Sequence, residues 1–255
     1  MKLSVNEISK KKVLHEISFS IVDGDRIALI GPNGSGKTTI LNIIMDLMSP
    51  SSGYVTKENI KMSAVFQNNI LDNDLTVYQN IFCRIKDPVA ISYMMEKMKL
   101  LRIDSHLQYS KLSGGQKRIV NFLRAIAANP NCLILDELTA GIDLETRQII
   151  WRNINDYLDN HSENCILYTT HLLDELNNAN KIIFISSGTI RYIGNVENFM
   201  KSTPKVKLTF NNNVKYFNTS NDAIKFTIDH KVSDEYFEIK KVNYSDLLEN
   251  WERKI

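Results

Sequence analysis

Residues 31–39, GPNGSGKTT, have the composition and spacing of a loop that binds phosphate groups. Glycines let backbone N–H groups approach an anion closely, the Lys37 ammonium can bind phosphate oxygens, and the Thr38 hydroxyl can ligate Mg²⁺. An apolar run precedes the loop and a helical pattern follows it, which is the context that this chemistry requires. The motif predicts a nucleoside triphosphate site whose candidate residues are Gly31, Pro32, Asn33, Gly34, Ser35, Gly36, Lys37, Thr38 and Thr39.

Two carboxylates, Asp136 and Glu137, end the apolar run of residues 132–135. The first is placed to hold the metal ion through its water shell. The second can act as a general base on a water molecule in line with the terminal phosphate, which contributes about 10²–10⁴-fold to a rate. An acidic pair at a strand end is more often a solvated turn, but the phosphate loop upstream favours the catalytic interpretation.

Two further polar residues, Gln67 and His171, each follow a short strand-like run. Strand ends at this edge of an open α/β sheet face the crevice in which ligands bind. Gln67 could contact both Mg²⁺ and the attacking water, and the imidazole of His171 could hydrogen-bond the terminal phosphate. A surface glutamine and a capping histidine are the alternatives for these two positions.

A second loop with anion-binding character starts the stretch LSGGQKRIV at residues 112–120. Ser113, Gly114, Gly115 and Gln116 precede a helical pattern, so backbone N–H groups and a positive dipole end are available to an anion. The chain already has a complete phosphate loop. A second one therefore calls for an explanation beyond binding the same nucleotide.

The elements that must position these residues alternate between short apolar strands and amphipathic helices. This order predicts an α/β fold with a doubly wound, largely parallel sheet, interrupted by a mostly helical insertion at residues 77–128. After the phosphate loop, apolar residues 40, 43, 44 and 47 are expected on one helical face. A composition shift at residues 202–204 predicts a small C-terminal α+β appendage over residues 204–255.

The overall composition limits the class of protein. The 255 residues carry 31 Lys+Arg against 29 Asp+Glu, a net charge of +2 that argues against a general nucleic-acid binder. The widely spaced Cys83, Cys132 and Cys165 are typical of reduced cysteines and form no metal-binding pattern. No apolar run approaches the roughly 18 residues of a membrane helix, so we expect no span of the bilayer.

In their order and spacing these motifs closely resemble those of the ATP-binding-cassette (ABC) family of ATPases, over roughly residues 1–200. Gln67 matches the family's Q-loop, LSGGQ its signature, CLILDE its second nucleotide motif, His171 its switch histidine, and Asp143 its D-loop. The resemblance implies a P-loop NTPase fold with a mostly parallel core sheet, an antiparallel β subdomain and an inserted helical subdomain. It further implies an ABC ATPase domain over residues 1–203 that binds ATP and Mg²⁺, with Thr38, Gln67 and Asp136 at the metal.

The same resemblance explains the second loop. Two cassettes of this family pack head to tail, and each nucleotide lies between the phosphate loop of one and the signature of the other. Ser113, Gly114 and Gly115 are then expected to bind the γ-phosphate held by a second ABC ATPase subunit. ATP binding would close this dimer and hydrolysis would open it.

The sequence departs from the family pattern at two places. No aromatic residue occurs in residues 1–18, where members usually stack one on adenine, so Val13 is the candidate apolar contact. Leu138 follows Glu137 where the family commonly has proline, a change that removes no catalytic group.

One cassette without a long heptad insertion is typical of a transporter subunit. The resemblance therefore implies transmembrane permease subunits as partners and a location at the cytoplasmic face of the cell membrane. The motif DELTAGID and the short tail resemble the ATPases of drug and bacteriocin exporters, which favours export. An importer ATPase and a regulatory ATPase without transport are the alternatives.

Overall fold

The computed structural model describes residues 1–66, 71–210, 213–232 and 237–253. Within them, six strands form the central sheet in the order β5-β6-β7-β3-β8-β9. Neighbours from β5 to β8 pair in parallel, and only β9 is antiparallel, which confirms the predicted α/β class. The strands are β3 (Arg26–Ile30), β5 (Met62–Val65), β6 (Cys132–Leu135), β7 (Cys165–Thr169), β8 (Lys181–Ser186) and β9 (Thr189–Asn195).

Both faces of this sheet are covered, as the wholly apolar sequences of β6 and β7 require. In β3, Ile27 and Leu29 pack toward α1 (Lys37–Ile44), whereas Ala28 and Ile30 pack toward the helices of the other face. The predicted helical face after the phosphate loop extends too far. Helix α1 ends at Ile44, so Leu47 lies beyond it and is 63% exposed.

An antiparallel sheet in the order β2-β1-β4 packs over α1. Its strands are β1 (Lys2–Lys10), β2 (Leu14–Val22) and β4 (Ser52–Glu58). The turn between β1 and β2 brings Val13 next to the phosphate loop. A Cβ atom added to Gly36 would lie 3.4 Å from the Val13 carbonyl oxygen.

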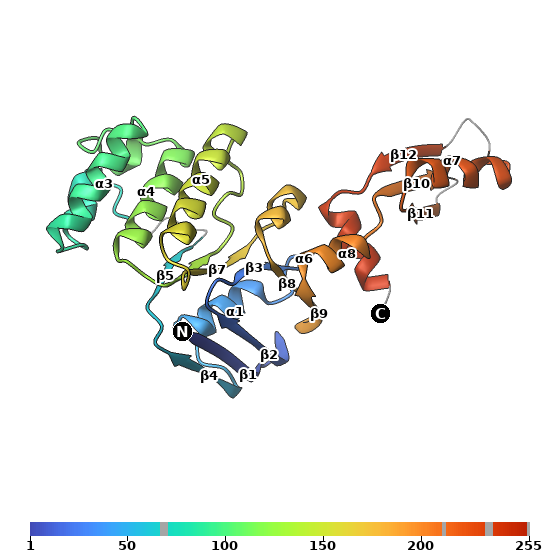
Figure 1. The fold of residues 1–255 in the computed structure, drawn as a ribbon, viewed down its shortest axis with the longest axis horizontal. Coiled ribbons are helices and arrows are strands. Elements are labelled where there is room, and N and C mark those ends of the chain that lie inside the picture. Colours follow the sequence, from blue (N-terminus) through green and yellow to red (C-terminus); the bar gives the residue numbers. More distant parts are fainter. Residues whose placement is uncertain (67–70, 211–212, 233–236, 254–255) are drawn as a thin grey trace.

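Helices dominate the inserted segment, at one end of the molecule in Figure 1. They pack with α5 (Leu144–Asn160) over the sheet through one continuous apolar cluster. The elements are α2 (Val77–Phe82), α3 (Pro88–Leu100), the short 3₁₀ turn η1 (Tyr109–Lys111) and α4 (Gly114–Ala127).

The C-terminal segment forms a second small antiparallel sheet in the order β11-β10-β12, at the opposite end of Figure 1. Its elements are β10 (Val206–Phe210), β11 (Asn213–Phe217), α7 (Ser220–Asp229), β12 (Phe237–Lys241) and α8 (Tyr244–Arg253). Val206, Leu208 and Ala223 form its own small core. In contrast, Leu247 and Leu248 of α8 belong to the main core, so α8 bridges the two parts. The domain boundary at residues 203–204 stays a prediction.

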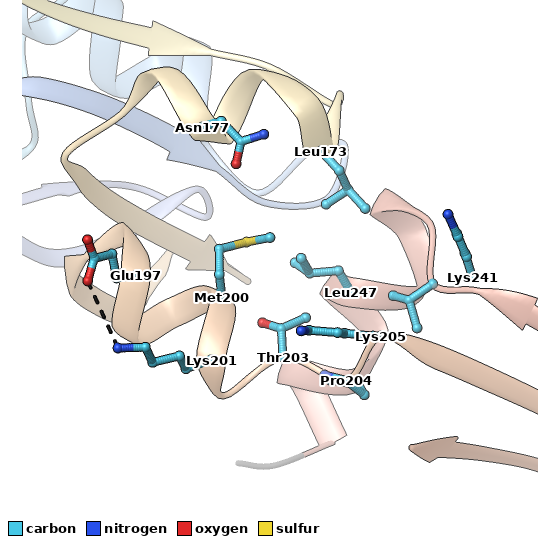
Figure 2. Close-up of a pocket in the computed structure, with 11 residues that line it drawn as sticks. Leu173, Asn177, Glu197, Met200, Lys201, Thr203, Pro204, Lys205, Lys241 and Leu247 are labelled. Atoms are coloured by element: carbon cyan, nitrogen blue, oxygen red, sulfur yellow. Dashed lines mark ion pairs between the residues drawn. The ribbon is translucent and has the colours of Figure 1, made fainter. Parts of the chain in front are cut away.

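A cavity of about 510 Å³ lies where the chain enters and leaves this appendage. Figure 2 shows Met200 of α6 (Val196–Lys201) and Leu247 of α8 pointing toward each other across it. Leu173, from the 3₁₀ segment η2 (Leu173–Asn178), forms another apolar wall. A cavity thus remains between the main core and the appendage. Two of the elements that line it also lie close to sequence motifs, since η2 follows His171 and α8 contains Tyr244, which contacts Gly31.

Candidate nucleotide-binding site

The phosphate loop connects β3 to α1, and its backbone requires glycine at two positions. Gly31 has φ 154°, and a side chain there would collide with the carbonyl oxygen of Ile185. Gly36 has φ 106°, at the N-cap of α1, and a side chain there would meet Leu14. No side chain caps the start of α1 among the described residues, so its first N–H groups are left for a ligand.

Lys37 lies inside this loop with only 7% of its surface exposed. Its ammonium donates hydrogen bonds to the carbonyl oxygens of Gly31, at 2.8 Å, and Pro32, at 3.0 Å. Burial lowers the pKa of Lys37, while the charges of Glu137 and Asp136 act in the opposite direction. The ammonium therefore lies near the acidic pair Asp136 and Glu137.

Thr38 and Asp136 come together at the start of α1. Thr38 Oγ1 donates a 3.1 Å hydrogen bond to Asp136 Oδ2. Asp136 Oδ1 accepts a second bond, of 2.7 Å, from the Thr169 hydroxyl, whose oxygen in turn accepts the N–H of Glu137 at 2.8 Å. Thr169, on the neighbouring strand β7, thereby orients both acids.

This donor set fits Mg²⁺. A hydroxyl and a carboxylate oxygen are hard ligands, and Mg²⁺ usually keeps several waters and takes the rest of its ligands from substrate phosphates. The described residues hold no group of three or more His, Cys, Asp or Glu side chains that could cage a metal ion. A metal ion held mainly by water and phosphate would suit such a site, and Thr38 and Asp136 are its candidate protein ligands. Gln67 lies outside the described residues.

Glu137 and His171 face each other across the ends of β6 and β7. The His171 Nε2 atom is 3.5 Å from Glu137 Oε2, with 38% and 17% of the two side chains exposed. The backbone of Glu137 has φ 49°, in the left-handed region that costs a non-glycine residue free energy. Such strain is found where a side chain must point in one particular direction.

A cavity of about 360 Å³ opens over the phosphate loop. Val13 and Glu137 lie on its walls together with the loop residues Asn33, Gly34, Gly36, Lys37, Thr38 and Thr39. Ser35 Oγ is buried and has no hydrogen-bond partner among the residues that the structure describes. A phosphate oxygen would satisfy that hydroxyl, so the loop fits the predicted ligand.

The residues of the second loop are held in a helix cap. Ser113 Oγ accepts the N–H of Gln116 at 3.2 Å, and Gln116 Oε1 accepts the N–H of Ser113 at 3.0 Å. Among the described residues that line the phosphate-loop cavity, none belongs to residues 112–116. The phosphate loop and the second loop therefore do not share this cavity.

Gly115 and Asp143 meet at Thr146, in the first turn of α5. A side chain on Gly115 would approach Thr146 Cγ2 to 2.8 Å. Asp143 caps α5 by accepting the N–H of Thr146 at 2.8 Å and its hydroxyl at 2.7 Å, and these bonds lower the pKa of Asp143. The signature loop and the D-loop position thus lie side by side.

Two arginines tie α4 to the strand that leads toward Gln67. Arg118 donates to the carbonyl oxygen of Phe66 at 3.1 Å, and Arg124 donates to that of Ala64 at 3.2 Å. Burial lowers the pKa of both guanidinium groups. A displacement of the signature helix would therefore pull on β5.

Comparison with known proteins identifies the family. A family model described as ABC transporter matches residues 14–140. The chain is also 32% identical, over 201 residues, to the energy-coupling factor transporter ATP-binding protein EcfA1 of Lactiplantibacillus plantarum, covering 71% of each protein. This chain belongs to the ATP-binding-cassette family of ATPases.

The names of two other relatives of this cassette state opposite transport directions. The Nod factor export ATP-binding protein I of Rhizobium johnstonii is 32% identical over 183 residues, which are 65% of this chain and 58% of that protein. The sulfate/thiosulfate import ATP-binding protein CysA of Mesostigma viride is 29% identical over 249 residues, or 85% of this chain and 71% of the relative. The cassette thus spans little more than half of the exporter-type relative.

Solved structures show the same fold. An ATP-binding subunit of an ABC transporter superposes with a TM-score of 0.70 at 19% identity, covering 79% of this cassette and 92% of that chain. A dimeric cassette in a post-hydrolysis state with ADP and Pi superposes with a TM-score of 0.67 at 23% identity, covering 76% and 98%. No described helix of this cassette is long and apolar enough to span a bilayer.

Two residues that shape the site of this cassette, Glu175 and Tyr244, belong to none of the sequence motifs. Glu175, only 2% exposed, accepts the Trp151 indole N–H at 3.0 Å and the Thr170 hydroxyl, and so anchors the turn after His171. Tyr244 accepts the N–H of Gly31 at 3.3 Å. No local signal marks either one, because an acid in LLDEL looks solvated and Tyr244 is 213 positions from Gly31.

Proposed function

We propose that this cassette is the ATP-hydrolysing subunit of a transporter, in which ATP-driven dimer closure moves separate membrane-spanning subunits. The observation that supports it most is the contact of 3.1 Å between Thr38 and Asp136 beside the phosphate-loop cavity. It joins the two nucleotide motifs of the sequence in one place. A phosphate-binding loop with a metal-binding acid is the machinery of phosphoryl transfer.

The phosphate loop is proposed to bind the ATP substrate. Backbone N–H groups of residues 33–39 cradle the phosphates, and the Lys37 ammonium exchanges its bonds to Gly31 and Pro32 for bonds to β- and γ-oxygens. Thr38 and Asp136 hold Mg²⁺, with Gln67 as a further ligand. When bound, this metal ion neutralises charge that develops on the phosphates.

Glu137 is the general base in the proposal, and His171 binds the γ-phosphate. The side chain of Glu137 is 17% exposed, so a water molecule can reach the carboxylate while most of it is shielded from bulk solvent. His171 Nε2 lies 3.5 Å from this carboxylate, so one imidazole reaches both the base and the reacting phosphate.

The signature loop completes the site of a second subunit. Ser113, Gly114, Gly115 and Gln116 are proposed to bind the γ-phosphate held by that subunit, with Asp143 at the same interface. The support is that α4 begins at Gly114, in a fully formed helix cap, away from the cavity of its own phosphate loop. Adenine is proposed to contact Val13, on the wall of that cavity.

We propose transport outward, at the cytoplasmic face of the cell membrane, with transmembrane permease subunits as partners. The support is the named Nod factor exporter among the relatives, together with the exporter-like motif DELTAGID. Import is the second candidate, because the sulfate/thiosulfate importer aligns with 85% of this chain. The chain itself supplies the ATPase in either case.

The test is to purify the full chain from detergent-solubilised membranes of its host and identify what accompanies it. A protein with several membrane spans is the expected companion, and recovery of the chain alone would contradict the transporter role. Direction is read from the reconstituted complex. A solute that stimulates ATP hydrolysis from the cassette side supports export, and stimulation only from the opposite side supports import.

A further inference from the structure

The C-terminal helix α8 docks on the main core of the cassette. The Trp251 ring stacks on that of Phe199 in α6, with centroids 4.8 Å apart and planes at 7°. Trp251 Nε1 donates a 3.1 Å hydrogen bond to Thr203 Oγ1, and Leu247 is fully buried. Stacked rings and buried leucine contribute stability beyond what a surface helix would gain.

The start of α8 is held equally firmly by the small C-terminal sheet. Asp246 pairs with Lys207 of β10 at 2.6 Å, and the Asp246 side chain is only 8% exposed. Asn243 and Asp246 also exchange hydrogen bonds, of 3.1 Å and 2.9 Å. Tyr244, one of the two residues between them, therefore takes its position from the appendage as well as from the core.

Tyr244 reaches the nucleotide motifs on two sides. Its hydroxyl accepts the N–H of Gly31, the first residue of the phosphate loop, at 3.3 Å. Its ring meets the imidazole of His171 edge to face, with centroids 6.2 Å apart and planes at 75°. Burial raises the pKa of Tyr244 to about 12, so the hydroxyl remains protonated and neutral at physiological pH.

The imidazole of His171 is thus flanked by two side chains. Glu137 lies on one side, at 3.5 Å, and the ring of Tyr244 lies on another. A cavity of about 350 Å³ lies beside His171 and Tyr244 and is also lined by Pro32, Asn33 and residues of α8. Without the Tyr244 ring, the imidazole would therefore have room to change its orientation. An ordered imidazole loses less freedom on reaching the γ-phosphate.

We propose that Tyr244 is a positioning residue for ATP hydrolysis, which fixes the start of the phosphate loop through its hydroxyl and the orientation of His171 through its ring. The inference rests on the proposed roles of the phosphate loop and His171. Because α8 is tied to both the core and the small sheet, the position of Tyr244 depends on how the C-terminal segment docks.

The test compares the steady-state kinetics of the full chain with those of Tyr244→Leu and Tyr244→Phe. Tyr244→Leu removes both ring and hydroxyl and is expected to lower kcat about tenfold, with KM for ATP within about threefold of wild type. Tyr244→Phe keeps the ring, so its kcat should be much closer to that of wild type, with only a small loss from the missing hydroxyl. Tyr192→Phe is the matched control, because it removes a hydroxyl bonded to the Asn195 carbonyl oxygen, near Trp251 but remote from the loop.

Equal kcat values for wild type and Tyr244→Leu would overturn the proposal, as would a rise in KM alone. If Tyr244→Leu fails to fold, the comparison of Tyr244→Phe with Tyr192→Phe decides, since a measurable kcat loss is expected only in the former. Glu137→Gln measured in parallel separates this inference from the proposed function. Turnover by Glu137→Gln would contradict the assigned base, whatever Tyr244 does.

Discussion

The imidazole Nε2 of His171 lies 3.5 Å from the carboxylate Oε2 of Glu137. The register of the sheet produces this approach, because Leu135 of β6 pairs with Tyr168 of β7, and each functional residue follows its strand within three positions. Backbone pairing thus brings together the two residues that we propose as general base and phosphate ligand. Thr169 adds a second link by bonding Asp136 and the N–H of Glu137.

Replacing Lys37 with alanine should weaken ATP binding itself. A charge-assisted bond of about 1.5–3 kcal/mol to the phosphates is lost, which corresponds to a Kd increase of roughly 10- to 100-fold. The measurement is equilibrium titration of the full chain with a fluorescent ATP analogue. Lys11→Ala, in the exposed turn between β1 and β2, is the control for loss of one positive charge. Unchanged affinity in Lys37→Ala would count against the role of the loop.

Ser113→Arg should block ATP-driven dimer formation while a single chain still binds ATP. Ser113 caps α4, so its loss costs about 1 kcal/mol of stability, and the added guanidinium obstructs the interface proposed for the second subunit. Sedimentation of a hydrolysis-deficient background with and without ATP measures the effect. Ser110→Arg, three residues earlier on an exposed turn, adds the same charge outside the loop. Loss of ATP binding by the single Ser113→Arg chain would contradict the shared-site argument.

The folded state should lose stability at alkaline pH through Tyr244. Burial raises its pKa from 10.0 to about 12, so between these values the unfolded chain releases the proton first and unfolding becomes easier as pH rises. Denaturant titrations of wild type and Tyr244→Phe at several pH values isolate this group. The stability advantage of wild type should shrink by at most about 2 kcal/mol from pH 10 to 12. A constant difference would show that the hydroxyl is not buried.

Most of the candidate nucleotide site could be predicted from local sequence motifs. Gly31 through Thr38 form one loop after a strand, and the pair Asp136–Glu137 follows the end of another strand. The exposed Leu47 shows where periodicity failed, since α1 ends three residues earlier, at Ile44. Tyr244 could not be found from the sequence. Its contact with Gly31 depends on how α8 folds back after the whole appendage, and no spacing rule reports a contact 213 positions apart.

The substitution Glu137→Gln tests most directly whether the Glu137 carboxylate activates the water that attacks ATP. The substitution keeps shape and hydrogen bonding but removes the base, so hydrolysis should fall by about 10²-fold or more. ATP should still bind, and the dimer should accumulate because it cannot reopen. Glu96→Gln, on the exposed side of α3, controls for loss of one carboxylate. Phosphate release is measured beside dimer mass: a stable ATP-bound dimer without turnover is predicted, and hydrolysis near the wild-type rate would contradict the account.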